Sequence, residues 1–233
     1  MKIPKNAKIS DAKRYLKKVG LEIVIKNSLE NNKKNTDQRF SKKVYQPEIN
    51  DLYRLYKFIV ENKRTRILEY GTGWSSLVMY KALMFNKNNS PKIPYPRIKN
   101  PFSLTVVDDN KKYLSISKKR IDKFFSKKTN ISFNYSECRM TTYNGKIASH
   151  YTKHPNINPD FIYLDGPDQF KIKGKVNNIT IADYEMMPMA CDILKFENFL
   201  MPGTIILTDG RRANAIFLEK NFQRNWIYCF DEK

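Results

Sequence analysis

Apolar residues in this chain follow two spacings, which alternate along the sequence. The clearest helical segment follows Pro47, where Ile49, Leu52, Tyr56 and Ile59 recur every three or four positions. This spacing predicts a helix with one face toward a core. Proline suits the first turn of such a helix because the N–H group that it lacks would have no partner there.

Five short apolar runs, bounded by polar or glycine-containing segments, are typical of buried strands. Longer stretches with helical spacing lie between and after them. We therefore predict strands at residues 66–70, 103–107, 131–135, 161–164 and 204–207, with a last strand at 226–230. We predict helices at residues 75–85, 111–125, 183–199 and 213–222, the third of them bent or delayed by Pro188.

Strands that alternate with helices require parallel pairing through right-handed crossovers. The order therefore predicts an α/β fold, a doubly wound, mostly parallel sheet with helices on both faces. We assign this domain to residues 46–233 and expect residues 1–45 to form a basic N-terminal arm or cap with a short helix. Residues 86–101, rich in Asn, Pro and Lys, are predicted to be a surface loop.

Acidic residues stand at the carboxyl ends of the predicted strands. Glu69 lies at the end of the first strand, Asp108 and Asp109 follow the second, Asp165 the fourth and Asp209 the fifth. In doubly wound sheets, ligands bind outside these ends. The acidic residues therefore gather where a ligand is expected.

The segment Glu69-Tyr70-Gly71-Thr72-Gly73-Trp74-Ser75 follows a strand and opens a helix. Its glycines allow a tight turn and a close approach by a ligand, and the helix start offers free N–H groups. These properties suit a nucleotide-type cofactor. The NAD-binding motif has a third glycine, where this chain has Ser76, and its acid follows after about 20 residues, well before Asp108. A P-loop needs a lysine after the glycines, and none is present.

With an acid two positions before Gly71-Thr72-Gly73, this segment resembles the first motif of the class I S-adenosylmethionine (SAM)-dependent methyltransferases. In that family an acid at the end of the second strand holds the ribose hydroxyls, and Thr105-Val106-Val107-Asp108 has this form. A carboxylate can accept hydrogen bonds from both hydroxyls. The resemblance implies a SAM site made of Glu69, Gly71, Thr72, Gly73, Ser75 and Asp108, with Asp109 as the alternative to Asp108.

The fourth strand distinguishes branches of this family. Amino-methylating nucleic-acid enzymes resemble one another in an N/D-P-P-Y/F motif, and cytosine-C5 enzymes use a Pro-Cys nucleophile. This chain has neither, and its Asp165-Gly166-Pro167-Asp168 segment is similar to small-molecule O-methyltransferases. In their catechol type, Asp165 and Asp209 would hold a divalent cation with an asparagine, but Gly210 stands in its place. A hydroxyl acceptor is therefore expected, and a divalent metal is only a doubtful second cofactor.

Methyl transfer to a hydroxyl requires a base. Asp165 is the candidate catalytic residue because it would face the sulfonium end of the cofactor, where partial desolvation raises the pKa of a carboxylate. Asp168, Asp209 and Arg211 are the candidate substrate-binding residues, and Arg211 can grip a carboxylate or phosphate. Loops at residues 20–46, 86–100, 150–159 and 169–178 are expected to line the acceptor pocket.

Histidine and cysteine offer a weaker case for chemistry. His150 and His154, four residues apart, are either a base or ligand pair or two surface-loop residues. The three cysteines, Cys138, Cys191 and Cys229, include no Cys-x-x-Cys pair. Their spacing argues against a disulfide framework and against a zinc site.

The chain has 43 Lys and Arg residues and 23 Asp and Glu residues, a net charge of +20. This charge favours an anionic partner, but Lys, Asn and Ile are abundant everywhere, as AT-rich codon usage produces. The alternatives to a small-molecule methyltransferase are a nucleic-acid-binding or RNA-modifying protein and a SAM-fold binding module without catalysis. No apolar run approaches the roughly 18 residues of a membrane span, and a cytoplasmic protein without a membrane partner is expected.

The resembled fold ends with an antiparallel hairpin, whereas this sequence ends soon after residues 226–230, the first strand of that hairpin. Either the sheet lacks its last strand, or another segment fills that position. An open sheet edge can pair with another chain, and a homodimer that covers the edge is one remedy.

Overall fold

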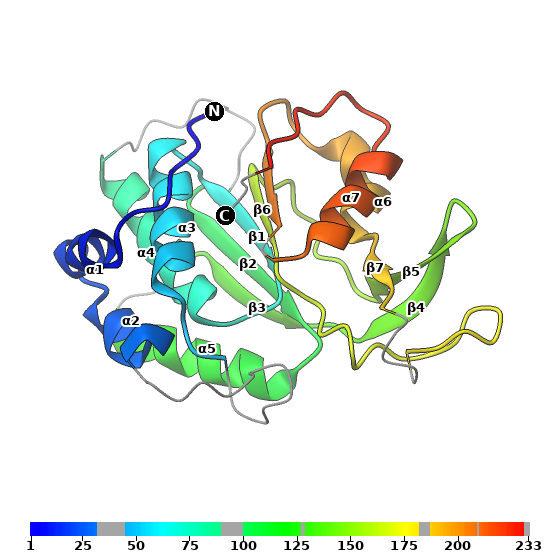
Figure 1. Cartoon of the computed structure of the whole chain (residues 1–233), viewed down its shortest axis with the longest axis horizontal. Helices are drawn as coiled ribbons and strands as arrows, with labels where there is room; N and C mark the ends of the chain where they lie inside the picture. The colour runs from blue at the N-terminus through cyan, green and yellow to red at the C-terminus, as the bar shows by residue number, and fades with distance from the viewer. Residues whose placement is uncertain (32–44, 90–99, 127–128, 182–186, 209, 231–233) are drawn as a thin grey trace.

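The computed structural model describes residues 1–31, 45–89, 100–126, 129–181, 187–208 and 210–230 (Figure 1). A five-stranded sheet lies at its centre, and all of its neighbouring strands are parallel. Across the sheet the order is β3 (Ile131–Tyr135), β2 (Ser103–Asp108), β1 (Arg66–Tyr70), β6 (Phe161–Leu164) and β8 (Ile205–Thr208). The strand order reverses between β1 and β6, which is where such sheets bind ligands.

Three helices cover one face of this sheet (Figure 1). They are α3 (Ile49–Glu61), α4 (Trp74–Asn89) and α5 (Lys111–Phe124). Their apolar sides share one core with strand residues such as Ile67 and Val106, both of which are buried. This face therefore holds the larger of the two apolar cores.

The N-terminal residues pack against the same core. Helices α1 (Ile9–Lys18) and α2 (Glu22–Asn27), followed by the short 3-10 helix η1 (Leu29–Asn31), bring Leu16 and Leu21 into it, and both side chains are fully buried. Burial of these leucines ties residues 1–31 to α3. The boundary at residue 45 stays a prediction, because residues 32–44 lie outside the described residues.

A smaller three-stranded sheet and two helices cover the opposite face (Figure 1). Strand residues such as Leu68 and Ile162 bury their side chains on this side. The elements of this layer are β4 (Cys138–Tyr143), β5 (Lys146–Tyr151), β7 (Met189–Ala190), α6 (Asp192–Phe196), the 3-10 helix η3 (Glu197–Phe199) and α7 (Arg212–Asn221). In the smaller sheet β4 pairs antiparallel with β5, and β5 pairs parallel with β7.

This architecture confirms the predicted α/β fold, a mostly parallel sheet with helices on both faces. Each of the five predicted central strands is present, and its ends agree with the prediction to within one residue. Within the described part of the chain, no helix combines the length and apolarity that a membrane span requires.

The helix predicted at residues 75–85 is longer than expected. It runs to Asn89, so the predicted loop does not begin at residue 86, and residues 90–99 lie outside the described residues. Asn86 is buried, and its amide donates to the carbonyls of Ile59 and Arg64 at 3.0 and 2.9 Å. This side chain satisfies the end of α3 and holds α4 helical past the predicted boundary.

The β4–β5 hairpin was not predicted. Its two-residue turn is Asn144-Gly145, with φ of 48° and 73°, and Asn-Gly is the sequence most typical of such turns because both positions need positive φ. The six residue pairs of this hairpin run from Cys138–Tyr151 to Tyr143–Lys146. The Asn-Gly pair is therefore the signal that would have located it.

The helix predicted at residues 183–199 is wrong at its start, whereas its second half is confirmed by α6 and η3, and the late start agrees with the effect expected of Pro188. Residues 182–186 lie outside the described residues, Met189–Ala190 form strand β7, and the helix begins only at Asp192. The side-chain amide of Asn214 pairs with the backbone N–H and carbonyl of Ala190, at 2.8 and 3.2 Å. This pairing, together with Pro188, favours extended backbone where apolar spacing indicated a helix.

The strand predicted at residues 226–230 is also wrong. Its Trp226 donates through Nε1 to Glu197 Oε1 at 2.9 Å, which attaches the segment to η3 instead of to the sheet. Among the described residues, β8 pairs with β6 alone. Because residues 231–233 lie outside the described residues, a missing last strand stays a prediction. A homodimer at this edge stays a prediction.

Candidate functional site

A cavity of about 690 Å³ opens at the carboxyl ends of β1, β2 and β6. It brings together nine of the eleven residues that the sequence singled out. Asp209 lies outside the described residues, and Glu69 is fully buried behind the cavity wall. The nine that line the cavity are Gly71, Thr72, Gly73, Ser75, Asp108, Asp109, Asp165, Asp168 and Arg211.

The floor of the cavity is a contact between two backbone loops. Gly71 has φ of +91°, and a Cβ atom there would lie 2.8 Å from the nitrogen of Gly166 and 2.9 Å from the carbonyl carbon of Asp165. A Cβ on Gly166 would lie 2.5 Å from the nitrogen of Gly71 and 2.6 Å from Tyr151 Oη. Only glycine fits at these two positions.

Gly73 is different, although it belongs to the same turn. A Cβ atom there would meet only Ser75 Oγ, at 3.8 Å. Because Gly73 lines the cavity, its bare backbone is accessible to a ligand, and a Cβ atom at this position would have free space.

Glu69 organises the turn from behind. Its two carboxyl oxygens accept hydrogen bonds from the hydroxyls of Ser75 and Ser76, at 2.5 and 2.6 Å. Burial raises the pKa of Glu69 to about 8, against the lowering effect of the two hydroxyls. The carboxyl group therefore joins β1 to the start of α4, and its role in cofactor binding stays a prediction.

Asp108 is the last residue of β2, and its side chain is buried although it borders the cavity. Its Oδ1 accepts a hydrogen bond from the N–H of Asn110 at 2.6 Å. Burial raises the pKa of Asp108 to about 7, while hydrogen bonds from the backbone of Asn110 and Thr72 lower it. Asp109 is half-buried, and burial followed by the charge of Asp168 raises its pKa to about 6. Both carboxyls border the cavity, so both remain candidates for the ribose.

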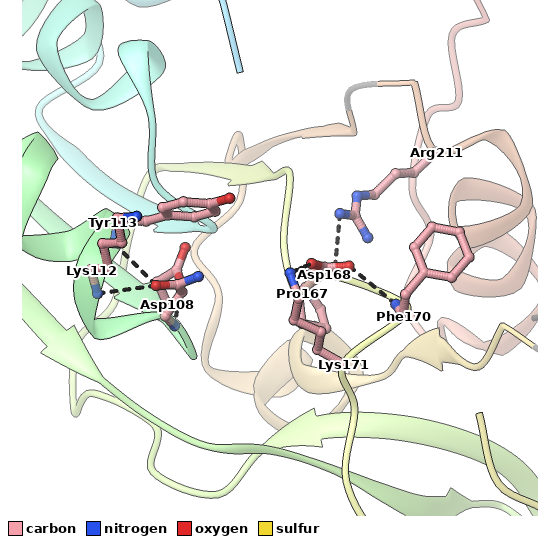
Figure 2. Close-up of polar contacts among 9 residues, drawn as sticks. Asp108, Lys112, Tyr113, Pro167, Asp168, Phe170, Lys171 and Arg211 are labelled. Carbon is pink, nitrogen blue, oxygen red and sulfur yellow. Dashed lines mark hydrogen bonds and ion pairs between the residues drawn. The ribbon is translucent and has the colours of Figure 1, made fainter. Parts of the chain in front are cut away.

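Across the cavity, Asp165 follows β6 and is exposed. Arg211 stabilises the loop that carries it. The guanidinium Nη2 donates to the carbonyls of Asp165 and Pro167, at 2.6 and 2.9 Å, and Figure 2 shows Arg211 reaching over this loop. Arg211 therefore has a structural role in addition to the predicted contact with substrate.

Asp168 is held at the same loop. Its carboxylate forms an ion pair with Lys171 and accepts a hydrogen bond from the N–H of Phe170 at 3.1 Å (Figure 2). The exposure of Lys171 makes this a surface-type ion pair, which stabilises the fold only weakly. Asp168 is oriented along the cavity wall by these two contacts.

Aromatic residues that the sequence did not single out complete the wall. Tyr113 of α5 and Tyr135 at the end of β3 line the cavity beside Asp108, and Tyr45 and Phe170 line it elsewhere. Tyr135 ends a central strand, so the strand-end rule that selected the acids would also have selected it.

The expected lining loops are only partly confirmed. Tyr45 and Gln46, and four residues between 169 and 173, line the cavity, whereas His150 and His154 do not. The two histidines are not a pair at this site, since His154 Nε2 lies 2.5 Å from Tyr70 Oη and His150 belongs to β5. Residues 90–99 are outside the described residues.

No group of three or more His, Cys, Asp or Glu in the described part of the chain is placed to hold a metal ion. Asp209 is outside that part, so the pair formed by Asp165 and Asp209 is not tested. The metal-free reaction therefore stays a prediction.

No family model and no curated protein matches the sequence. Among solved structures, the SAH-bound methyltransferase PaMTH1 of Podospora anserina is similar, with a TM-score of 0.46 over 94% of this chain and 76% of that chain, at 14% identity. A likeness this distant does not identify a family, and the function has to be inferred from the cavity itself.

Proposed function

We propose that this protein is a SAM-dependent methyltransferase that transfers a methyl group to a hydroxyl of a small-molecule or carbohydrate-like acceptor. One observation carries the proposal. A single cavity joins the bare backbone of Gly73, the carboxyl of Asp108 and the exposed carboxylate of Asp165. In the expected complex, Gly73 would contact the cofactor through its backbone, Asp108 would bind the ribose and Asp165 would face the acceptor.

The residues present fit the cofactor. Asp108 would accept hydrogen bonds from the ribose hydroxyls, and the rings of Tyr113 and Tyr135 could pack against a purine. The space around Gly73 that a side chain would fill is left to the ligand. The volume of about 690 Å³ lies within the range of roughly 300–1,000 Å³ typical of ligand pockets.

SAM, when bound, supplies a methyl group activated by a positively charged sulfur. The protein's own contribution is to align the acceptor oxygen with that carbon, which can supply much of the acceleration. As the O–C bond forms and the C–S bond breaks, Asp165 would take the hydroxyl proton. Asp165 is exposed, so its desolvation would have to come from the bound acceptor. Asp168 and Arg211 would orient the acceptor.

Calorimetry with SAM and with S-adenosylhomocysteine tests the proposal. We expect dissociation constants in the micromolar range, about −8 kcal/mol, for the wild type. Gly73→Val should abolish binding by filling the cavity, while its thermal unfolding stays close to that of the wild type. Asp168→Asn, on the opposite wall, is the control and should bind normally. A folded wild-type protein that gives no heat with either ligand would overturn the proposal.

Turnover separates an enzyme from a non-catalytic binding module. Methyl-labelled SAM should transfer label to a member of a hydroxyl-acceptor panel, and Asp165→Asn should retain SAM binding but lose transfer. Binding without transfer to any acceptor, in both proteins, would favour the binding module.

A nucleic-acid acceptor is the second candidate, and α5 is the observation that favours it. This helix begins at the cavity mouth, and its exposed residues include Lys112, Lys118, Lys119 and Lys123. Binding through phosphates weakens steeply with salt because counterions are released. A gel shift at physiological salt that is lost when Lys118, Lys119 and Lys123 become Gln would support it. Deletion of residues 1–43 is unsuitable, because it would uncover the core.

A further inference from the structure

Arg120 of α5 contacts the glycine turn at two neighbouring residues. Its Nη1 donates to the carbonyl of Gly73 at 2.9 Å, and its Cζ lies 3.8 Å from the centroid of the Trp74 ring. Ser117, one turn earlier on the same helix face, donates to the same carbonyl at 3.3 Å. Gly73 and Trp74 both line the cavity, so α5 holds the cavity wall from outside.

This arrangement partly buries the guanidinium of Arg120, which has no counter-ion among the described residues. Burial lowers the pKa of Arg120 to about 10, so the guanidinium is charged at neutral pH. None of the ion pairs in the described part of the chain includes Arg120. A half-buried charge without a carboxylate is unfavourable. The Gly73 carbonyl and the face of the Trp74 ring are the groups that offset this cost.

The contact fixes the orientation of one peptide group. In a trans peptide the carbonyl and the N–H point to opposite sides. Because the Gly73 carbonyl is held toward α5, the N–H of Trp74 is directed away from α5. Trp74 is the first residue of α4, and the first N–H groups of a helix have no intrahelical acceptor. Arg120, together with Ser117, therefore holds the peptide that carries the first N–H donor of α4.

We propose that Arg120 is a positioning residue for the cofactor: it holds the Gly73–Trp74 peptide in its ligand-binding orientation without itself contacting the ligand. The inference rests on the proposed function. Arginine suits this role because its planar guanidinium can lie on a ring and donate at its edge at the same time. A lysine ammonium group cannot stack on the Trp74 ring and donate to the Gly73 carbonyl with the same geometry.

Calorimetry with SAM on three variants tests the inference. Arg120→Met should weaken binding about tenfold, and Arg120→Lys should recover only part of the loss because it keeps the charge but not the geometry. Lys119→Met, an exposed neighbour on the same helix, is the matched control and should stay within about twofold of the wild type. Circular dichroism well below the unfolding temperature shows that each variant is folded.

A spectroscopic readout separates positioning from general stability. The chain has two tryptophans, so in a Trp226→Phe background the fluorescence reports on Trp74. In that background Arg120→Met should make Trp74 more accessible to acrylamide in the absence of ligand, and Lys119→Met should not.

The outcomes distinguish the inference from the function on which it rests. Equal SAM affinity of Arg120→Met and the wild type would overturn the inference and leave the function standing. Full recovery by Arg120→Lys would also overturn it, because charge alone would then be sufficient. A folded wild type that does not bind SAM would overturn both.

Discussion

The two halves of the cavity are built in different ways. The half proposed for the cofactor, called the cofactor half, consists of the glycine turn after β1 and the end of β2, where the backbone of Asp165 and Gly166 leaves no room for a side chain at Gly71. The half proposed for the acceptor, called the acceptor half, consists of loops, and Arg211 stabilises it by donating to the carbonyls of Asp165 and Pro167. The first half depends on glycine backbone and the second on a single long side chain.

Burial differs in the same direction. In the cofactor half, desolvation raises the pKa of Glu69 to about 8 and that of Asp108 to about 7. In the acceptor half, Asp165 is exposed and Asp168 pairs with the exposed Lys171. We infer that folding itself orders the cofactor half, so ligand binding does not have to order it. The acceptor half, in contrast, can change its sequence and its substrate with little effect on the fold.

The largest effect is expected from a substitution that adds one methyl group at the cavity floor. Gly166→Ala places Cβ within 2.6 Å of the Gly71 nitrogen and Tyr151 Oη, so the two loops must separate. We expect the free energy of unfolding to fall by about 3 kcal/mol or more, measured by urea denaturation. Gly73→Ala, in the turn after β1, where a Cβ atom would have free space, should change it by less than about 1 kcal/mol. Equal effects would mean that the floor is not tightly packed.

The sequence allowed the cofactor half to be predicted because its signals are local. The strand periodicity located β1 and β2, and the glycines and acids stand next to those strands in the chain. Asp108 is the last residue of its strand, as the prediction required. Tyr135 was missed only because the search at strand ends considered acids alone.

The layer of β7, α6, η3 and α7 could not be predicted in the same way. Met189–Ala190 became a strand because of Asn214, which follows it by 24 positions, and no local pattern contains that contact. Trp226 was assigned to a strand from its β-rich neighbours, but a buried acceptor on Glu197 determines its position. Both contacts are side-chain hydrogen bonds between segments that are distant in the sequence, and here they override the local spacing.

The next prediction concerns the ribose contact. Asp108→Asn should weaken SAM binding by roughly 1.5–3 kcal/mol, the value of charge-assisted hydrogen bonds, or about ten- to a hundredfold. Asp109→Asn should have a smaller effect, because Asp109 follows the strand and is less buried than Asp108, so water competes for its hydrogen bonds. Calorimetry at pH 8 measures both, and equal losses would mean that the two carboxyls share the ribose.

The same site should respond to pH. Because Asp108 has a pKa of about 7, it becomes protonated as the pH falls from 8 to 6 and then accepts hydrogen bonds less well. SAM affinity should decrease over this interval in the wild type and much less in Asp108→Asn. A parallel decrease in both proteins would assign the titration to another group.

Glu69 should make stability depend on pH. In the unfolded chain its carboxyl ionises near 4.5 and in the fold near 8, so only the folded state holds the proton between these values. The stabilisation is present at low pH and is lost as the pH rises through about 8. From pH 6 to pH 8 the free energy of unfolding of the wild type should fall by about 2 kcal/mol relative to Glu69→Gln. Urea denaturation at the two pH values measures this difference. The same change in the free energy of unfolding in the wild type and in Glu69→Gln would contradict the raised pKa.

The smallest effect is expected in the acceptor half. Arg211→Gln removes two hydrogen bonds to the loop after β6, and we expect it to lower the free energy of unfolding by about 1 kcal/mol. Arg212→Gln, an exposed neighbour, should leave it unchanged. If the halves are independent, Arg211→Gln should alter SAM affinity by less than about threefold, because a change at one site has little effect on another site with which it shares no contact. Yet the loop that Arg211 holds includes Gly166, which contacts Gly71. A tenfold loss of SAM affinity would therefore mean that the loss of the Arg211 contacts affects the cofactor half through the contact between Gly166 and Gly71. The two halves would then act as one site.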